Sequence, residues 1–419
     1  MNQKMKWTPL YACLAAAVIL TAFTVSGLIS KQILVDEYKL KAQELLGEAI
    51  HVFKEIRGFS LEDVEVEVVT INWAKEKWGK ALAEANKEQI MMEERIYKGL
   101  FLIPENASLY NVEVEWSGMI AAAVWQGKIY IVKEYFDFSD EFYAKRMLIH
   151  ELTHIMQGKY FAIEERALFD GEKAKSALIE GDARLMEEAY TNKTRESPPK
   201  TESAKIESLT AHYGKIISCN VAAALPDSIS RLFAFPYEYG LKFVKALYEN
   251  GGWEAVNRAY ANLPKTTEQI MHPEKYFINE TGKKANTPKP AVENWKEMKS
   301  DSYGEYFILV MFQNWIPENE AVMAAEGWGG DNLTYYENGE DYVFTWEILW
   351  DSASDALEFA ASFQNMVEKA EANKVGVNLW HKNEIFLSLT LRGEKTLVIS
   401  STNEVGINDF ISLLGRDFL

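Results

Sequence analysis

Two histidines and a glutamate, His150, Glu151 and His154, form the pattern H-E-x-x-H inside a segment whose apolar residues have helical spacing. Residues four apart on a helix lie on one face, roughly 5.4 Å from each other along the axis. Both imidazoles can therefore reach one tetrahedral zinc ion. Glu151 then lies close enough to take a proton from a water molecule that the ion activates. The pattern predicts a zinc site in which Glu151 is the general base.

A catalytic zinc site also needs a third protein ligand and one open position. No third histidine follows at a short spacing, and the chain has only two cysteines, Cys13 and Cys219. These are too few for a thiolate zinc site. A carboxylate is therefore expected as the third ligand.

The sequence Glu180-Gly181-Asp182-Ala183 lies in a second helical segment downstream of the histidines. H-E-x-x-H followed by a glutamate on a later helix resembles the gluzincins, a group of zinc peptidases. The pattern E-G-x-A is similar to the glutamate-bearing stretch of the aminopeptidase N-like family. The resemblance implies that His150, His154 and Glu180 are the zinc ligands and that Glu151 is the general base.

The same helix departs from thermolysin in its spacing and in one residue. The gap between His154 and Glu180 is longer, and Arg184 stands where thermolysin has an aspartate one turn after the glutamate. Asp182 or Glu187 is then expected to orient a histidine through its free N–H, as partners of metal-bound histidines do. The alternative for Glu180 is a solvated glutamate on an amphipathic helix.

Gluzincins also supply a tyrosine or histidine that stabilises the oxyanion formed during peptide hydrolysis. The resemblance suggests His272, Tyr237 or Tyr239 for this role. His272 precedes Pro273, which indicates a turn, so an alternative role for His272 is to cap local structure. The alternative for the tyrosines is packing in the core.

The composition indicates a folded, acidic protein. Apolar residues make up 48% of the 419 residues, and the formal net charge is -18. Nucleic acid is excluded as a partner, because its phosphates would be repelled by this charge.

An uncharged apolar run at residues 8–30 is long enough to cross a hydrocarbon core of roughly 30 Å. Lys4 and Lys6 precede it, which favours an inside N-terminus and an extracytoplasmic body. A cleaved signal peptide is the alternative, although the run is longer than usual for one.

The apolar spacing predicts a helix over 35–58, a strand over 61–71, a helix over 72–100 and a strand over 110–116. A β-hairpin over 121–132 is expected to turn at Gln126-Gly127 and to precede the H-E-x-x-H helix, as in zincin peptidases. The remaining expectations are a helix ending near Gly158, one from Glu172 to Tyr190, a loop at 191–205 and helices over 206–282. The C-terminal part is expected to hold strands at 333–339, 341–350, 375–382, 385–393 and 395–401 and a helix at 353–372.

Together these observations predict an α+β, mainly helical protein. Its expected parts are a cytoplasmic N-terminus (1–7), a transmembrane signal anchor (8–30), a zincin-like metallopeptidase domain (31–283) and a small C-terminal α+β domain (284–419). Residues from about 140 to 360 also resemble uncharacterised prokaryotic zincin-like proteins. The expected function is a membrane-anchored zinc metallopeptidase acting on a peptide or protein substrate. One alternative is a catalytically inactive zincin-fold module for binding or assembly, with structural or vestigial zinc. Hydrolysis of a non-peptide amide is a further alternative.

Overall fold

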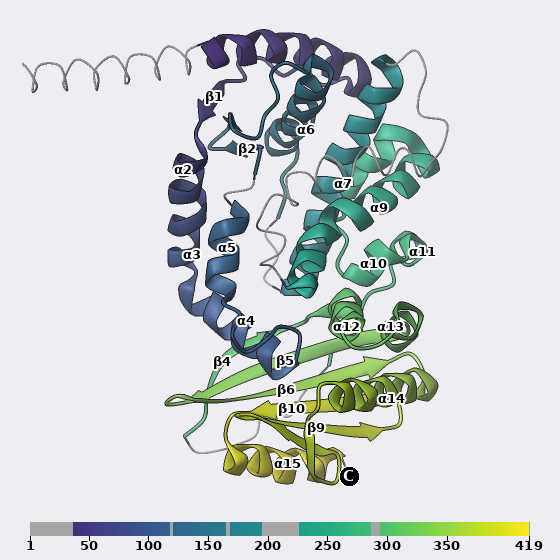
Figure 1. Ribbon diagram of the computed structural model, residues 1–419. Coiled ribbons are helices and arrows are strands. Elements are labelled where there is room, and N and C mark those ends of the chain that lie inside the picture. The colour runs from purple at the N-terminus through teal and green to yellow at the C-terminus, as the bar shows by residue number, and fades with distance from the viewer. Residues whose placement is uncertain (1–36, 118–119, 165–167, 195–225, 286–293, 419) are drawn as a thin grey trace, which may run out of the picture.

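The structure is a computed structural model that describes residues 37–117, 120–164, 168–194, 226–285 and 294–418. The predicted membrane anchor at 8–30 and most of the predicted loop at 191–205 lie outside these residues. Within them, no helix combines the length and apolar character needed to span a bilayer. The described chain is mixed α/β, with the first sheet and most helices in one half and a larger sheet in the other (Figure 1).

The first sheet contains the predicted hairpin. Its strands are β1 (Val66–Val69), β2 (Ala122–Trp125) and β3 (Lys128–Val132), in the order β1-β3-β2. β1 runs parallel to β3, and β2 runs antiparallel to it. Gln126 and Gly127 both have positive φ, as a two-residue hairpin turn requires. The hairpin is confirmed, and β2 is an edge strand among the described residues.

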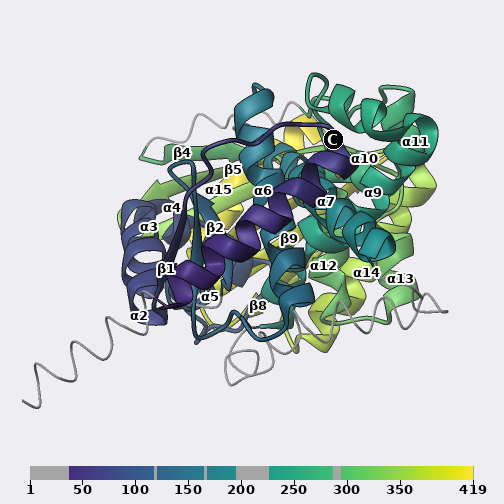
Figure 2. The same ribbon diagram turned by 90° about the horizontal axis from the view of Figure 1, so that it is seen from above.

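A helix over residues 37–57, called the N-terminal helix below, packs with α6 (Glu141–Tyr160) against this sheet. Figure 2 shows it lying across the top of the molecule, over α6 and the sheet. α6 begins at Asp140, whose carboxylate accepts the N–H of Tyr143. Apolar side chains from all three layers form one core, which fixes the face of α6 that points inward.

The predicted strand at 110–116 is wrong, because these residues belong to the helix α5 (Leu109–Ser117). Leu109 and Val112 are buried, and their separation of three residues fits one face of a helix. The alternation of apolar and charged residues in the same segment also fits a strand. The start of the helix decides between the two: Glu94 accepts the N–H of Leu109, and Ser108 accepts the N–H of Asn111. The preceding helical elements are α2 (Ile71–Ala74), the π-helical η1 (Lys75–Lys80), α3 (Ala81–Ala85) and α4 (Lys87–Gly99).

Two long helices, α7 (Phe169–Thr194) and α9 (Asp227–Ala259), cross at unusually close range. A Cβ added to Gly181 would lie 2.2 Å from the carbonyl oxygen of Gly240, and one added to Gly240 would lie 2.2 Å from that of Ala177. Glycine is therefore needed at both positions. α9 is kinked at Gly251 and Gly252, and it is followed by the short helices α10 (Thr267–Met271) and α11 (Pro273–Phe277).

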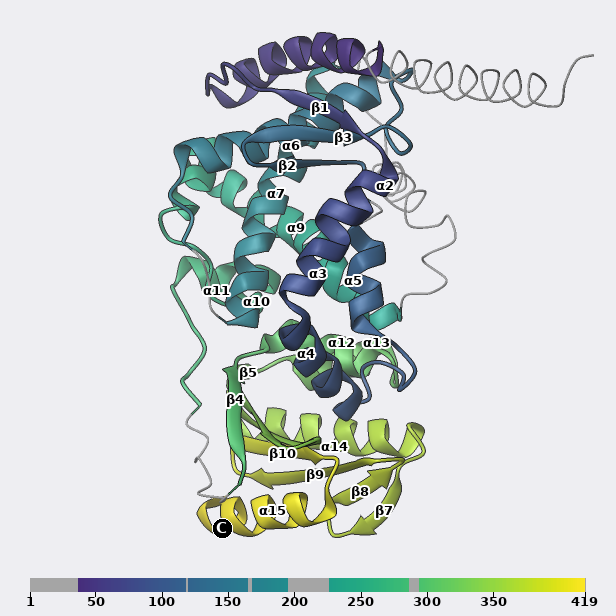
Figure 3. The same ribbon diagram turned by 90° about the vertical axis from the view of Figure 1, so that its left-hand side faces the viewer.

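The C-terminal sheet is antiparallel with the order β4-β5-β6-β10-β9-β8-β7. Figure 3 shows α14 on one side of this sheet and α15 on the other. Trp328, Trp346 and Trp350 are buried and pack its core. The strands are β4 (Lys296–Asp301), β5 (Trp328–Asn338), β6 (Asp341–Trp350), β7 (Asn373–Gly376), β8 (Leu379–Lys382), β9 (Ile385–Arg392) and β10 (Lys395–Ser401), and the helices are α12 (Gly304–Gln313), α13 (Glu318–Ala325), α14 (Ala353–Lys369) and α15 (Glu404–Phe418).

Two buried carboxylates join the two halves of the chain. Asp331 in β5 accepts the backbone N–H groups of Tyr303 and Gly304 at the start of α12, together with two indole N–H groups. Asp170 in α7 accepts the N–H of Thr267 at 2.8 Å and its hydroxyl at 2.6 Å. The first turn of α7, the start of α10 and the C-terminal sheet therefore meet at α12.

The close helix crossing predicts that Gly240→Ala destabilises the fold. The added methyl group has to displace the backbone of α7, which costs about 2–3 kcal/mol. Gly47→Ala is the matched control, because Gly47 lies on the exposed face of the N-terminal helix with open space around its Cα. The control is expected to be neutral or stabilising by up to about 1 kcal/mol. Chemical denaturation of both variants measures the difference, and an equally stable Gly240→Ala would contradict the crossing.

The junction predicts a pH-dependent stability. Burial raises the pKa of Asp170 to about 8, from a usual value of 3.8, despite the hydrogen bonds from Thr267. The folded state therefore binds the proton of Asp170 more tightly than the unfolded chain does. The stability that this proton contributes is lost as the pH rises towards and through 8. Asp170→Asn should lack this loss. At pH 9 its free energy of unfolding should exceed that of the wild type by at least about 1 kcal/mol, since one pKa unit is worth about 1.4 kcal/mol. Thermal melts from pH 5 to 9 test this, with the exposed Asp63→Asn as control; parallel curves for wild type and Asp170→Asn would refute it.

Candidate metal centre

α6 and α7 bring the three predicted metal ligands together. The Nε2 atoms of His150 and His154 lie 3.0 Å apart. Oε2 of Glu180 lies 3.3 Å from Nε2 of His150 and 3.6 Å from Nε2 of His154. Among the described residues, these three form one of two groups of histidine and carboxylate side chains close enough to hold a metal ion.

The outward nitrogens of the two histidines show which ring atoms carry protons. Nδ1 of His150 lies 2.8 Å from a carboxylate oxygen of Glu187, which only accepts, so this Nδ1 carries a proton. Nδ1 of His154 lies 2.8 Å from Oε1 of Gln157. The amide nitrogen of Gln157 is directed at the carbonyl oxygen of Ile179, so Oε1 faces the imidazole and accepts its proton. Nε2 of each imidazole is therefore the nitrogen that faces the centre and can bind a metal ion.

Three potential ligand atoms thus converge on one point, and a shared cation, a proton or a metal ion, makes this arrangement favourable. For tetrahedral zinc with ligands at about 2.0–2.2 Å, neighbouring ligand atoms are roughly 3.3–3.6 Å apart. The three observed separations, from 3.0 to 3.6 Å, are close to that size. The donor set of two imidazoles and one carboxylate is one that catalytic zinc uses, since three protein ligands leave the fourth position of a tetrahedral ion for water.

The charges around the centre also favour a divalent cation. Glu187 is paired with Arg146, and Asp182 is paired with Arg57. Among the described residues, neither Glu151 nor Glu180 pairs with an arginine or lysine, and Oε2 of each is buried without a hydrogen-bond partner. Two carboxylates therefore remain without a fixed cationic partner.

The pKa values of the side chains at the centre reflect these surrounding charges. Burial alone would lower the pKa of His150, but the neighbouring carboxylates of Glu180 and Glu187 outweigh burial and raise the pKa to about 10. Burial also opposes ionisation of Glu187, yet Arg184 and His150 lower its pKa to about 2. The pKa of Glu151 is raised, chiefly because the side chain is buried. The site thus stabilises positive charge at the imidazoles and makes Glu151 a stronger base.

Of the two carboxylates expected to orient a histidine, Glu187 contacts His150 directly. Asp182 contacts neither histidine and instead pairs with Arg57 and with the hydroxyl of Tyr260. Gln157 is the partner of His154 that the sequence analysis missed. Its position three residues after His154, on the same helix face, is a usable signal.

The three residues suggested for stabilising the oxyanion lie on or next to α9 and α10. Nε2 of His272 lies 3.0 Å from Glu305 of α12. His272 is also the residue at which α10 ends, so it caps local structure. Tyr237 is half-buried on α9, one turn before the crossing residue Gly240. Tyr239 packs against Phe235 and Tyr306 in the core. An oxyanion role for His272 or Tyr237 stays a prediction.

The second group of carboxylates, Glu268, Glu280 and Asp351, already surrounds a cation. Nζ of Lys275 lies 2.6 Å from Glu268, 2.8 Å from Glu280 and 3.6 Å from Asp351. The ammonium group supplies the positive charge there, so this group is a structural ion-pair cluster.

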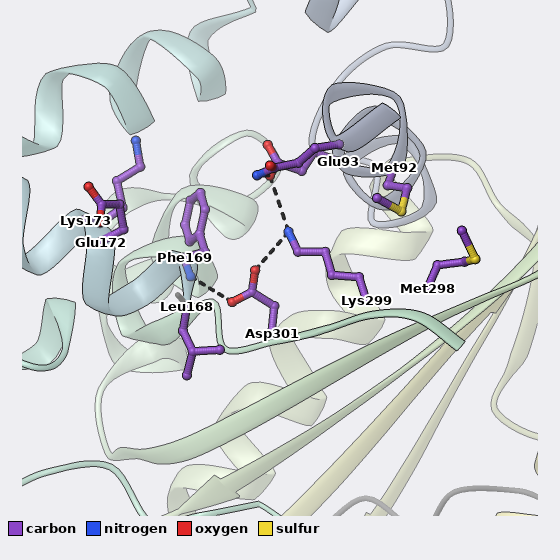
Figure 4. Close-up of a pocket in the computed structure, with 10 residues that line it drawn as sticks. Met92, Glu93, Leu168, Phe169, Glu172, Lys173, Met298, Lys299 and Asp301 are labelled. Carbon is purple, nitrogen blue, oxygen red and sulfur yellow. Dashed lines mark hydrogen bonds and ion pairs between the residues drawn. The ribbon is translucent and has the colours of Figure 1, made fainter. Parts of the chain in front are cut away.

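A pocket of about 410 Å³ lies between α4, the start of α7 and β4, and it contains none of the predicted site residues (Figure 4). One of its two lysines, Lys299, points between Glu93 and Asp301 and pairs with both. These charges hold α4 against the C-terminal sheet, and the pocket belongs to the junction between the two halves of the chain.

Residues 292–409 match one family model. It is described as a domain of unknown function (DUF8575), and the match runs from just before β4 into α15. No curated protein and no solved structure matches the chain. The metal-centre residues lie outside the matched range, so the proposal below depends on their own geometry.

The centre predicts one zinc ion per chain. His150→Ala or Glu180→Ala removes one of the three converging atoms, so zinc affinity should fall by more than the roughly 10–100-fold typical of losing an outer partner. His51→Ala is the control, because His51 is an exposed residue paired with Glu55. Mass spectrometry of metal content after zinc loading and dialysis measures all four proteins. Full zinc content in Glu180→Ala would rule out the ligand set.

Proposed function

We propose that the chain is a zinc-dependent metallopeptidase of gluzincin type, with His150, His154 and Glu180 as the metal ligands. The observation that carries the proposal is the convergence of three potential ligand atoms beside the buried carboxylate of Glu151. The resemblance to gluzincins in H-E-x-x-H and E-G-x-A supports the same reading. The apolar run at residues 8–30 supports a single-pass anchor with the catalytic part extracytoplasmic.

Zinc supplies Lewis acidity at such a site, polarising the substrate carbonyl and making water acidic near neutral pH. The task of Glu151 is to accept the proton of the attacking water at its free Oε2 and to pass it to the leaving amine nitrogen. Its raised pKa suits both transfers, because the carboxylate binds a proton more readily than an exposed glutamate does. Glu187 and Gln157 keep the two imidazoles turned toward the centre.

The edge strand supports a peptide as the substrate. β2 contacts α6 and has no second partner strand among the described residues. An extended peptide that pairs with this edge uses backbone hydrogen bonds and therefore requires no particular side chains. This position would lay the substrate backbone alongside the H-E-x-x-H helix.

A zincin-fold module for binding or assembly is the second candidate. The C-terminal sheet favours it, because this large unit supplies none of the three ligands. Such a module would bind zinc but would not need Glu151 as a base.

Glu151→Gln separates the two candidates. The amide cannot accept the proton, so hydrolysis of a random-sequence peptide pool, followed by mass spectrometry, should fall by about 10²–10⁴-fold. Zinc content should stay at the wild-type level, because Glu151 is not a ligand. Glu188→Gln is the matched control, since Glu188 lies on α7 and pairs with Lys245. Zinc-loaded wild type that cleaves no peptide in the pool would reject the peptidase in favour of the binding module.

A further inference from the structure

A buried chain of polar groups leads from the N-terminal helix to the metal centre. Arg57, the last residue of that helix, donates to both carboxylate oxygens of Asp182, at 3.2 and 3.1 Å. The hydroxyl of Tyr260, just after α9, donates to Asp182 at 2.8 Å. The side chains of Arg57 and Asp182 are 0% exposed, so the pair is sealed from water.

The chain continues from Tyr260 to His154. The amide nitrogen of Gln157 donates to the Tyr260 oxygen at 2.8 Å and to the carbonyl oxygen of Ile179 at 2.9 Å. With both donors used, only Oε1 of Gln157 is left to face the imidazole, where it accepts the proton of Nδ1 at 2.8 Å. Each group in the chain therefore has its orientation fixed by the next one.

We infer that Arg57, Asp182, Tyr260 and Gln157 form a positioning relay that fixes the ring plane and proton of His154, and that it couples docking of the N-terminal helix to metal affinity. The inference rests on the proposed zinc site and names a means of regulating it. None of these four side chains supplies a metal ligand; they act through His154.

The two histidines differ in how they are supported. His150 donates to the carboxylate of Glu187, whose charge is balanced by Arg146. His154 donates to a neutral amide, whose orientation depends on Tyr260. A hydrogen bond to an amide is weaker than one to a carboxylate, so the orientation of His154 depends on Tyr260 keeping Gln157 in place.

Arg57 is bound at its other face as well. Its guanidinium lies 4.3 Å from the ring centroid of Trp253, which follows the kink of α9. Undocking the N-terminal helix would remove the cation from Asp182 and leave a buried carboxylate unpaired. Tyr260 and Gln157 would then lose the arrangement that orients His154.

The test uses full-length Tyr260→Phe. This variant removes only the hydroxyl, and the ring can keep its stacking on Phe161, whose centroid lies 4.2 Å away. Zinc affinity is measured by chelator competition, and the geometry of the centre by the visible absorption of the cobalt-substituted protein. We expect zinc binding to weaken by about 10–100-fold, the range for losing an outer partner of a ligand, and the cobalt spectrum to shift.

Tyr306→Phe is the matched control, because it removes a hydroxyl bonded to the carbonyl oxygen of Arg231 in the core. It should bind zinc like the wild type and leave the cobalt spectrum unchanged, whatever it costs in stability. Wild-type affinity and spectrum in Tyr260→Phe would overturn the relay, as would an equal loss in Tyr306→Phe.

Arg57→Lys tests the coupling to the N-terminal helix, since lysine keeps the charge but not the two-oxygen contact. Its zinc affinity should fall between that of the wild type and that of Tyr260→Phe, and wild-type affinity would overturn the coupling. Wild type that binds zinc but cleaves no peptide would reject the proposed activity while the affinity differences still support the relay. Wild type that binds no zinc would overturn both.

Discussion

Three potential ligand atoms that face one another repel unless a proton or a metal ion lies between them, and this constraint organises the centre of the molecule. The Nε2 atoms of His150 and His154 and a carboxylate oxygen of Glu180 are held within 3.0 to 3.6 Å of one another. The neighbouring carboxylates form ion pairs with arginines: Glu187 pairs with Arg146, and Asp182 pairs with Arg57. The two carboxylates left without such a partner, those of Glu180 and Glu151, are the ones assigned roles in the proposed zinc site.

The helices hold this arrangement through backbone contacts as well as side chains. Glu180 and Asp182 flank Gly181, which lies where α7 crosses α9 at Gly240. One short stretch of α7 therefore combines a proposed metal ligand, a close helix contact and the carboxylate that binds Arg57. This explains why the glycine of the E-G-x-A pattern has a packing role in addition to any functional one.

Features with a local signal were predictable from the sequence. His150 and His154 share a helix face by their spacing alone, and the hairpin was indicated by alternation around Gln126-Gly127. The helix over 110–116 was not predictable, because its V-E-V-E alternation is typical of a strand. The start of this helix is fixed by Glu94, a residue on another helix. α12 was missed because its apolar residues are buried on all sides and so show no period.

The outer partners of the centre needed the structure. Arg57 and Tyr260 reach α7 and α6 across 125 and 103 residues, and no spacing rule connects such positions. Asp182 is next but one to Glu180 in the sequence, yet its side chain turns to Arg57 because a buried carboxylate requires a cation. Glu187, one of two candidates for orienting a histidine, fills that role for His150 because it lies two turns after Glu180 on the same face of α7.

The most direct test of the metal centre is anomalous diffraction at the zinc absorption edge from crystals of the zinc-loaded, full-length protein. The account predicts an anomalous peak about 2.0–2.2 Å from the Nε2 atoms of His150 and His154 and from a carboxylate oxygen of Glu180. A peak at the Glu268, Glu280 and Asp351 cluster in its place, or none near the two histidines, would contradict it.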